Sequence, residues 1–139
     1  MNVLDRQITL DGPRNLVVKW TGVLDNSDIS ETPALALGDC INNSSIQTLV
    51  GFRVDMLEYS IGNGIEVQLQ WNSAFPQQIY NLAGRGKIFS SSYGGFLPDS
   101  TRVGYDGNIN LITTGFDPNT VQNFTLVLEF VKLYRHENG

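Results

Sequence analysis

The chain has 139 residues, of which 41% are hydrophobic and 17% are charged. This length suits one domain with its own core, and the composition is too apolar for a disordered chain and too weakly charged for a coiled coil. Because fourteen acidic residues outnumber nine Lys and Arg, giving a formal net charge of −5, we expect no nucleic-acid partner: affinity for phosphate depends on clustered cations.

The cysteine count and the hydropathy of the chain exclude further kinds of site and segment. Cys40 is the only cysteine, so one chain cannot form an internal disulfide or a zinc site built from cysteines. Residues 1–6 lack the cationic start and apolar run of a signal peptide, and no stretch reaches about eighteen consecutive apolar residues. We therefore expect folding in a reducing cytosol, with no membrane partner and no cofactor.

The first part of the chain predicts two strands. Apolar and polar residues alternate loosely from Val3 to Leu10 and stop at Asp11-Gly12-Pro13, a turn sequence. Leu16 to Leu24 follows as a second strand, in which Gly22 indicates a bulge or the close approach of another group.

Residues 26–45 are predicted to form a long irregular loop. They are rich in Asn, Ser and Asp around the apolar island from Ala34 to Leu37. A short helix could begin after Ser30 or Thr32, because both residue types cap helix N-termini. At about twenty residues the segment is long for a plain connection, which suggests a functional excursion.

Alternation with a period of two becomes clear from Gly51 onward. The apolar residues of 52–56 share one parity and those of 57–61 share the other, and this switch predicts either a bulge or a strand with both faces covered by apolar residues. The Gly-Asn-Gly sequence at 62–64 predicts a hairpin turn. Residues 65–71 then show the cleanest alternation of inward apolar and outward polar side chains in the chain.

Further strands are predicted towards the end of the chain, at Ile79 to Leu82, Lys87 to Ser90, Gly107 to Thr114 and Asn123 to Tyr134. Residues 90–104 are expected to form a structured surface loop, and residues 135–139 a polar tail. The last strand is apolar on both parities, as in a strand covered on both faces or lying at a subunit contact.

These elements predict one all-β domain over residues 1–139. About eight strands separated by frequent turn signals favour an antiparallel β-sandwich or jelly roll, with a β-barrel as the alternative.

Residues suited to catalysis are sparse. The only histidine, His136, lies in the polar tail, which leaves no Ser-His or Cys-His pair. Asp55 and Glu58 could serve a hydrolase that uses two carboxylates, but their odd spacing on a strand predicts opposite faces unless a bulge realigns them. Asp25 and Asp28 offer oxygen ligands without the full spacing of a calcium loop, so an ion there stays an open question. We expect no catalytic residues and no enzyme activity.

Aromatic residues allow two functional interpretations. If Trp71, Tyr80, Tyr93 and Tyr105 form an exposed coplanar set, they predict a sandwich that binds carbohydrates or a receptor. If they lie in a core or a subunit contact, they indicate a structural protein.

Several segments resemble small structural proteins of tailed-bacteriophage virions. They are Asn2-Val3-Leu4-Asp5, Asp11-Gly12-Pro13-Arg14-Asn15-Leu16-Val17-Val18-Lys19-Trp20-Thr21-Gly22, Asp25-Asn26-Ser27-Asp28, Leu82-Ala83-Gly84-Arg85-Gly86-Lys87, Tyr93-Gly94-Gly95-Phe96 and the strand from Phe124 to Lys132. The resemblance covers most of the chain outside residues 31–47 and consists of turn and strand patterns with no catalytic signature.

This resemblance implies a non-enzymatic virion protein of the capsid decoration (cement) type. Such a protein would be made in the host cytoplasm, bind the major capsid protein on the outer capsid surface and associate with its own copies, for example as a homotrimer. A tail or head-fibre component is the alternative. We expect contacts from the N-terminal strand, the 26–45 loop and loop aromatics, through Val3, Leu4, Leu35, Leu37, Tyr93, Phe96 and Tyr105.

Overall fold

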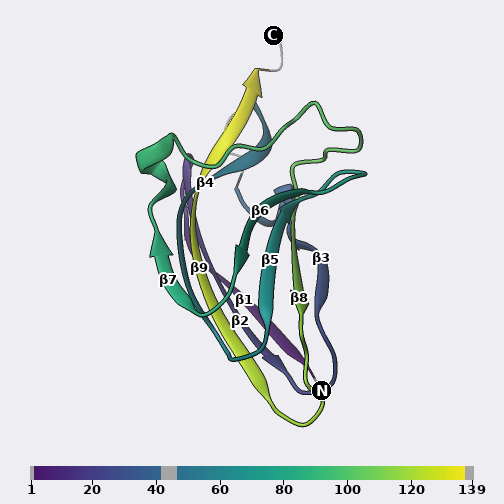
Figure 1. Cartoon of the computed structure of the whole chain (residues 1–139). Coiled ribbons are helices and arrows are strands. Elements are labelled where there is room, and N and C mark those ends of the chain that lie inside the picture. Colours follow the sequence, from purple (N-terminus) through teal and green to yellow (C-terminus); the bar gives the residue numbers. More distant parts are fainter. Residues whose placement is uncertain (1, 42–46, 137–139) are drawn as a thin grey trace.

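The computed structural model describes residues 2–41 and 47–136, which form two antiparallel sheets packed face to face (Figure 1). The larger sheet has the order β1 (Val3–Asp11), β2 (Asn15–Leu24), β9 (Gln122–His136), β4 (Gln47–Ile61) and β7 (Arg85–Ile88). The smaller sheet has the order β3 (Ser30–Leu35), β8 (Ile109–Thr114), β5 (Glu66–Trp71) and β6 (Gln77–Leu82). The predicted all-β sandwich is confirmed, with nine strands in the described ranges where about eight were expected.

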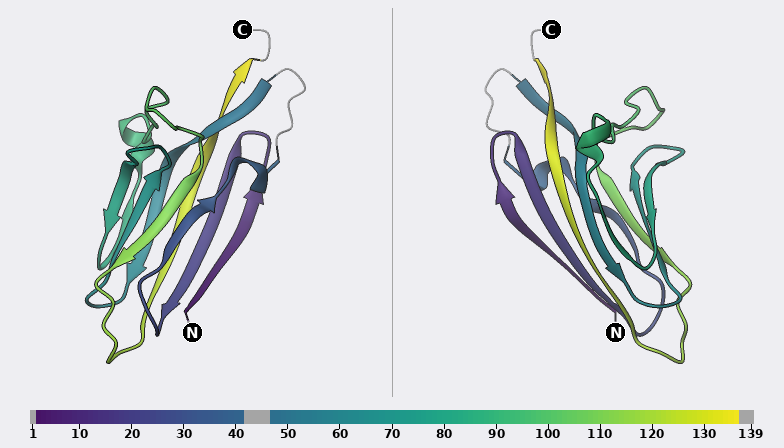
Figure 2. Two further views of the ribbon diagram at one scale, coloured as in Figure 1. Left: turned by 90° about the vertical axis from the view of Figure 1, so that its right-hand side faces the viewer. Right: turned by 60° about the vertical axis from the view of Figure 1, so that its left-hand side comes forward.

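The order of the strands is that of a jelly roll. β2 pairs with β9, β3 with β8, β4 with β7, and β5 with β6, as if one long hairpin had been rolled into two sheets. From β2 onward every connection crosses between the sheets except the β5–β6 turn. The connecting segments therefore gather at the two ends of the sandwich (Figure 2), and β1 adds one strand at the edge next to β2.

Alternating residues of the two sheets fill the space between them. Trp20 packs edge-on against Phe130, with ring centroids 6.4 Å apart, and Phe52 lies 5.5 Å from the same ring. All three side chains have no exposed surface. Burying a large apolar side chain contributes roughly 1.5–3 kcal/mol, so this aromatic group is a main source of stability.

β9 lies in the centre of the larger sheet, between β2 and β4. Its inward residues are buried, and on the outward parity Val131 is buried as well. This explains the apolar residues on both parities. Gly22 lies opposite Phe124 in the β2–β9 ladder, where a Cβ would overlap the Phe124 ring, so Gly22 marks a close approach and not a bulge.

The predicted loop at 26–45 is partly wrong. Residues 30–35 form β3, and Leu37–Asp39 form the short 3₁₀ helix η1, so no helix begins after Ser30 or Thr32. The capping residues are overridden because β3 pairs with β8 and buries Leu35. Residues 42–45 of the predicted loop lie outside the described residues.

Of two other local predictions, one is confirmed and one is wrong. The parity switch in β4 is confirmed, since its register against β9 shifts between Val54 and Met56. The hairpin at residues 62–64 is wrong, because β4 and β5 belong to different sheets and the segment crosses between them. Turn chemistry specifies a tight reversal, with Gly64 at φ +85°, but not the sheet that the next strand joins.

The end of the chain also differs from its prediction. Arg135 and His136 belong to β9 and pair with residues 47–48, so they are not part of a tail. Residues 137–139 of the predicted tail lie outside the described part. A second short 3₁₀ helix, η2, covers Ser90–Tyr93, and no helix in the described ranges is long and apolar enough to cross a membrane.

Candidate interaction surface

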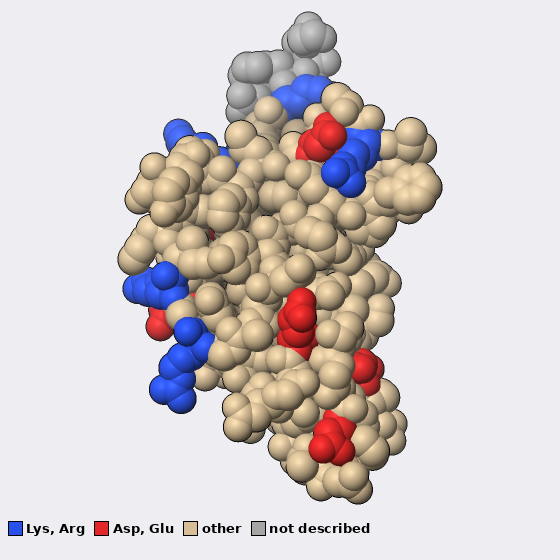
Figure 3. Space-filling view, viewed as in Figure 1, with Lys and Arg blue, Asp and Glu red and all other residues tan. Residues whose placement is uncertain are grey.

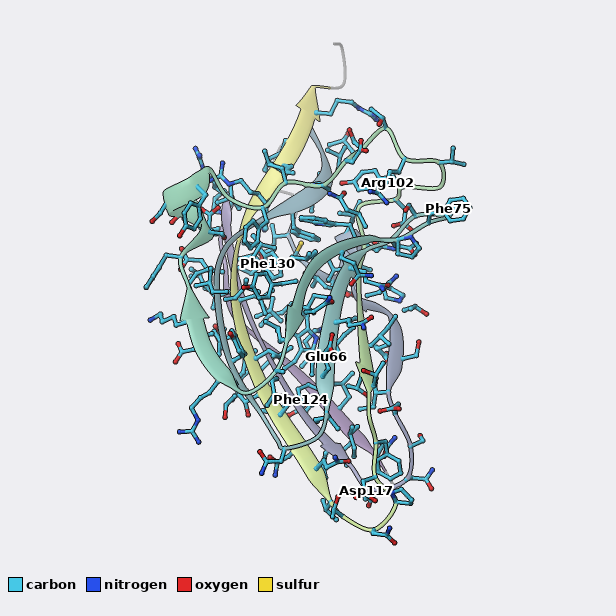
Figure 4. The ribbon with its side chains drawn as sticks, viewed as in Figure 1. Glu66, Phe75, Arg102, Asp117, Phe124 and Phe130 are labelled. Carbon is cyan, nitrogen blue, oxygen red and sulfur yellow. The ribbon has the colours of Figure 1, made fainter. Side chains whose placement is uncertain are left out.

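One end of the sandwich carries a projecting tip, formed by the β5–β6 turn (residues 72–76) and by residues 99–104 of the β7–β8 connection (Figure 4). Phe75 is 83% exposed and Val103 is 80% exposed. Large apolar side chains are normally withdrawn from water, and aromatic residues are enriched in protein interfaces. The tip therefore exposes two large apolar side chains among polar residues, which makes it a candidate contact surface.

Hydrogen bonds hold the two segments of the tip together. The Ala74 N–H donates to the Val103 carbonyl at 2.8 Å, and Arg102 Nη1 donates to the Phe75 carbonyl at 3.0 Å. Ser73 Oγ also donates to the Phe75 carbonyl, at 2.7 Å. A segment that is ordered before binding loses little conformational entropy when a partner docks, which favours tight contact.

Asp99 fixes the turn that leads to Val103. Its Oδ1 accepts from Thr101 Oγ1 at 2.5 Å and from the Thr101 N–H at 3.1 Å, and these bonds lower the pKa of the Asp99 carboxyl. Arg102 Nε lies 3.7 Å from the same carboxylate. The tip thus presents its apolar side chains beside one balanced pair of charges.

The four aliphatic residues predicted as contacts differ in how exposed their side chains are. Val3 is exposed on β1, whereas Leu4 and Leu37 are half-buried against the core. Leu35 has no exposed surface, so the prediction that it contacts a partner is corrected. An apolar island in an apparent loop suggests exposure, but pairing of β3 with β8 places Leu35 inside.

The three aromatic residues predicted as contacts also differ in exposure. Tyr93, at the end of η2, is 79% exposed. Phe96 is half-buried and stacks on Tyr80, with ring centroids 6.1 Å apart. The half-buried Tyr105 donates its hydroxyl to the Val50 carbonyl at 3.1 Å, and burial raises the pKa of this phenol. Of the three, Tyr93 is the most accessible to a partner.

The rings considered for carbohydrate stacking are divided between core and surface. Trp71 is buried, and its Nε1 donates to the Phe52 carbonyl at 3.1 Å. Tyr80 and Tyr93 are exposed, while Tyr105 is half-buried. Because Trp71 lies inside the sandwich, the four rings do not form one exposed coplanar platform.

The two carboxylates considered for hydrolysis each form an ion pair. Asp55 is the extra residue of the β4 bulge, and Arg53 donates to its carboxylate from Nε at 2.7 Å and from Nη2 at 3.1 Å. These bonds raise the pKa of the Arg53 guanidinium. Glu58 lies 3.8 Å from Lys87 Nζ on the neighbouring strand β7. Both carboxylates thus have a structural explanation.

The acidic segment at 25–28 joins connections at the other end of the sandwich. Asp28 Oδ1 accepts from Thr113 Oγ1 and from the Phe116 N–H, both at 3.1 Å. Asn2 Oδ1 accepts from the Asp25 N–H at 3.0 Å. Within residues 2–41 and 47–136, no cluster of three or more His, Cys, Asp and Glu side chains is arranged to hold a metal ion.

The single cysteine is partly withdrawn from solvent. Cys40 is half-buried, Sγ donates weakly to the Leu37 carbonyl at 3.5 Å, and burial raises the pKa of the thiol. The side chain of His136 lies outside the described part of the chain.

Charged side chains are sparse on the face shown in Figure 3, where Lys and Arg gather at the left flank and the upper end. On β7, Lys87 Nζ lies 4.9 Å from the ring centroid of Phe89 in addition to its contact with Glu58. The short basic sequence around Arg85 and Lys87 is therefore partly neutralised by its neighbours.

Sequence reasoning missed Phe75 and Val103, the most exposed apolar residues of the tip. A signal was available for Phe75: it stands in Asn72-Ser73-Ala74-Phe75-Pro76, a turn sequence between two strands. An aromatic residue in such a turn has no sheet face to cover it. Val103 lies between Arg102 and Gly104 in an irregular segment, where no periodicity indicates its direction.

Comparison with known proteins gives a likeness of fold. A chain in the atomic structure of Sulfolobus Turreted Icosahedral Virus matches with a TM-score of 0.52 and 15% identity, over 96% of this chain and 31% of that chain. This chain thus spans about a third of the length of the viral chain. A cupin superfamily protein from Desulfitobacterium hafniense matches with a TM-score of 0.34 and 9% identity, over 91% of this chain and 76% of that one. No protein-family model and no curated protein matches the sequence.

Proposed function

We propose that this chain is a non-enzymatic structural component of a virus particle that binds neighbouring coat chains. The observation that carries the proposal is a jelly roll with a pre-formed apolar tip, in which Phe75 and Val103 stand out from one end. The jelly roll is a recurrent architecture of viral capsid domains. The likeness in fold to a chain of Sulfolobus Turreted Icosahedral Virus supports the same assignment.

The finer form of the proposal is a decoration (cement) protein on the outer capsid surface, with the major capsid protein and further copies of the chain, for example in a trimer, as partners. Exposed apolar residues lie at separate places: Phe75 at the tip, Tyr93 at the end of η2 and Val3 on β1. Several modest contacts made together give slow release from a lattice, and binding only the assembled form stabilises it. The net charge of −5 opposes premature association of free copies.

Co-sedimentation of the purified chain with empty shells tests this proposal. The double variant Phe75→Ser with Val103→Ser is expected to bind at least about tenfold more weakly, because two apolar anchors are lost. Val121→Ser is the matched control. Val121 is 67% exposed in the β8–β9 connection at the opposite end of the sandwich, and its replacement is expected to leave shell binding unchanged.

Two results would count against the proposal. A wild-type chain that stays in the supernatant at every shell concentration would contradict a structural role in the particle. Binding to a glycan array that disappears in Tyr80→Ala or Tyr93→Ala would favour the carbohydrate-binding or receptor-binding alternative.

A further inference from the structure

A hollow of about 590 Å³ lies on the outward face of the larger sheet, at the edge formed by β7. This β7 hollow is lined by residues of β4, β7 and β9, among them Glu58, Ser60, Arg85, Lys87, Thr125 and Val127. β7 forms the left flank in Figure 1, and Lys and Arg gather on that flank in Figure 3. Pockets for small ligands commonly have volumes of about 300–1,000 Å³, so the hollow has room for a small molecule and not only for an ion.

One row of side chains crosses the hollow from β7 to β9. Ser60 of β4 lies opposite Arg85 on β7 and opposite Thr125 on β9. The neighbouring Leu126 has no exposed surface and faces the core, so alternation turns this row outward. Arg85, Ser60 and Thr125 are exposed, and their side chains form no hydrogen bond or ion pair with another described residue. Their polar groups are therefore accessible to a ligand.

A second row lies two residues away along the strands. Glu58 is opposite Lys87 on β7 and Val127 on β9, and its carboxylate lies 3.8 Å from Lys87 Nζ. Two residues of a strand span about 7 Å, which separates this carboxylate row from the guanidinium row. The two cations Arg85 and Lys87 against the single carboxylate give the lining a charge of +1, in a chain whose formal net charge is −5.

The polar groups of the two rows define the chemistry of a ligand. The guanidinium of Arg85 matches a carboxylate, to which it can donate two parallel hydrogen bonds. The hydroxyls of Ser60 and Thr125 both donate and accept, whereas the Glu58 carboxylate only accepts and needs a donor on the ligand. A ring that carries one carboxylate and several hydroxyls satisfies both rows at once.

Other anions fit the β7 hollow less well. Phosphate or sulfate alone has no set of donors for Glu58, which would repel its charge. An extended acidic peptide binds largely through its backbone. Over the floor of the hollow, β4 pairs with both β7 and β9, and β9 pairs with both β2 and β4, so no backbone edge is available there.

We propose that the β7 hollow binds an acidic sugar, a sugar ring that carries a carboxylate. Arg85 holds the carboxylate, and Ser60, Thr125 and Glu58 hold the ring hydroxyls. This inference goes beyond the proposed function and does not depend on it, because the tip expected to bind coat chains is formed by other segments.

An NMR titration of the purified, isotope-labelled chain tests the site. The probes are D-glucuronic acid and N-acetylneuraminic acid, with D-glucose, inorganic phosphate and a short polyglutamate peptide as comparisons. At least one of the two acidic sugars is expected to shift the amide signals of residues 58–60, 85–87 and 125–127. D-glucose is expected to bind at least about tenfold more weakly, because it lacks the carboxylate.

Three substitutions at exposed positions test the roles of the side chains. Arg85→Gln is expected to weaken binding of the acidic sugar at least about tenfold, and Ser60→Ala about three- to tenfold. Arg14→Gln is the matched control, because Arg14 is exposed in the β1–β2 turn outside the hollow and its replacement changes the net charge equally. This control is expected to bind like the wild type, and the amide spectrum of each variant shows whether its fold is kept.

Several results would overturn the inference. They are the absence of shifts with both acidic sugars, shifts that map outside the hollow, and equal or tighter binding of phosphate or polyglutamate. A loss of affinity in Arg14→Gln as large as that in Arg85→Gln would show that net charge and not the hollow determines binding. Because the titration uses the purified chain alone, its failure is distinct from a failure of the chain to bind shells.

Discussion

At the scale of single residues, the two tryptophans show how similar side chains can have different roles. Both are buried in the core between the sheets. Trp71 Nε1 donates to the Phe52 carbonyl at 3.1 Å, whereas Trp20 Nε1 has no acceptor in the described part of the chain. The hydrogen bond of Trp71 therefore stabilises the fold, whereas burying the unpaired indole N–H of Trp20 is unfavourable.

This contrast predicts different stabilities for two conservative variants. Trp71→Phe and Trp20→Phe both leave a small cavity, but only Trp71→Phe also removes a hydrogen bond. We expect Trp71→Phe to lower the free energy of unfolding by about 1 kcal/mol more than Trp20→Phe does. Urea denaturation of the purified variants measures the difference. Equal losses, or a larger loss for Trp20→Phe, would show that the indole of Trp20 is already satisfied.

At the scale of elements, Lys132 joins three segments that are distant in sequence. Its side chain is fully buried on β9, and Nζ donates to Asp11 Oδ1 at 2.5 Å, to the Gly12 carbonyl at 2.6 Å and to the Ile41 carbonyl at 2.7 Å. The ammonium group has three N–H donors, and these three acceptors satisfy them. The β1–β2 turn and the chain after η1 are therefore fixed to the end of β9.

Removing this ammonium group is expected to destabilise the protein. Lys132→Met removes the donor shared by Asp11 Oδ1 and two carbonyls, although Asp11 Oδ2 still accepts from the Ile41 N–H, so we expect a loss of about 2–4 kcal/mol in the free energy of unfolding. Lys19→Met, on the outward side of β2, is the matched control and should change stability by less than about 0.5 kcal/mol. Thermal and urea denaturation measure both. A Lys132→Met protein as stable as the control would contradict the structural role of Lys132.

Elements formed by local alternation were predictable from the sequence, and elements formed by distant pairing were not. β2 and β5 follow the alternation of apolar residues closely, because one side of each faces the core. The sequence predicts a loop where β3 forms, because the stability of this strand comes from pairing with β8, about eighty residues further along. The sequence predicts that Lys132 lies in an apolar strand but not what it binds, because its acceptors lie 91 to 121 residues away. The tip depends on similar contacts between Ala74 and Val103.

At the scale of the whole molecule, the jelly roll separates its core from its exposed contact features. The tip stands at one end, and among the described residues β1 forms the edge of the larger sheet along one side (Figure 1). The face in Figure 3 bears few charges, so no strong single-signed field covers it. This arrangement suits a protein that touches more than one neighbour at once, and each contact can be weakened by a separate substitution.

Cryo-electron microscopy of purified particles shows directly whether this chain is a structural component of the particle. We expect density for this jelly roll on the outer surface, repeated with the symmetry of the shell, with Phe75 and Val103 against a coat chain. Particles whose maps contain no density for this fold, and whose mass spectra contain no peptides of this chain, would contradict it.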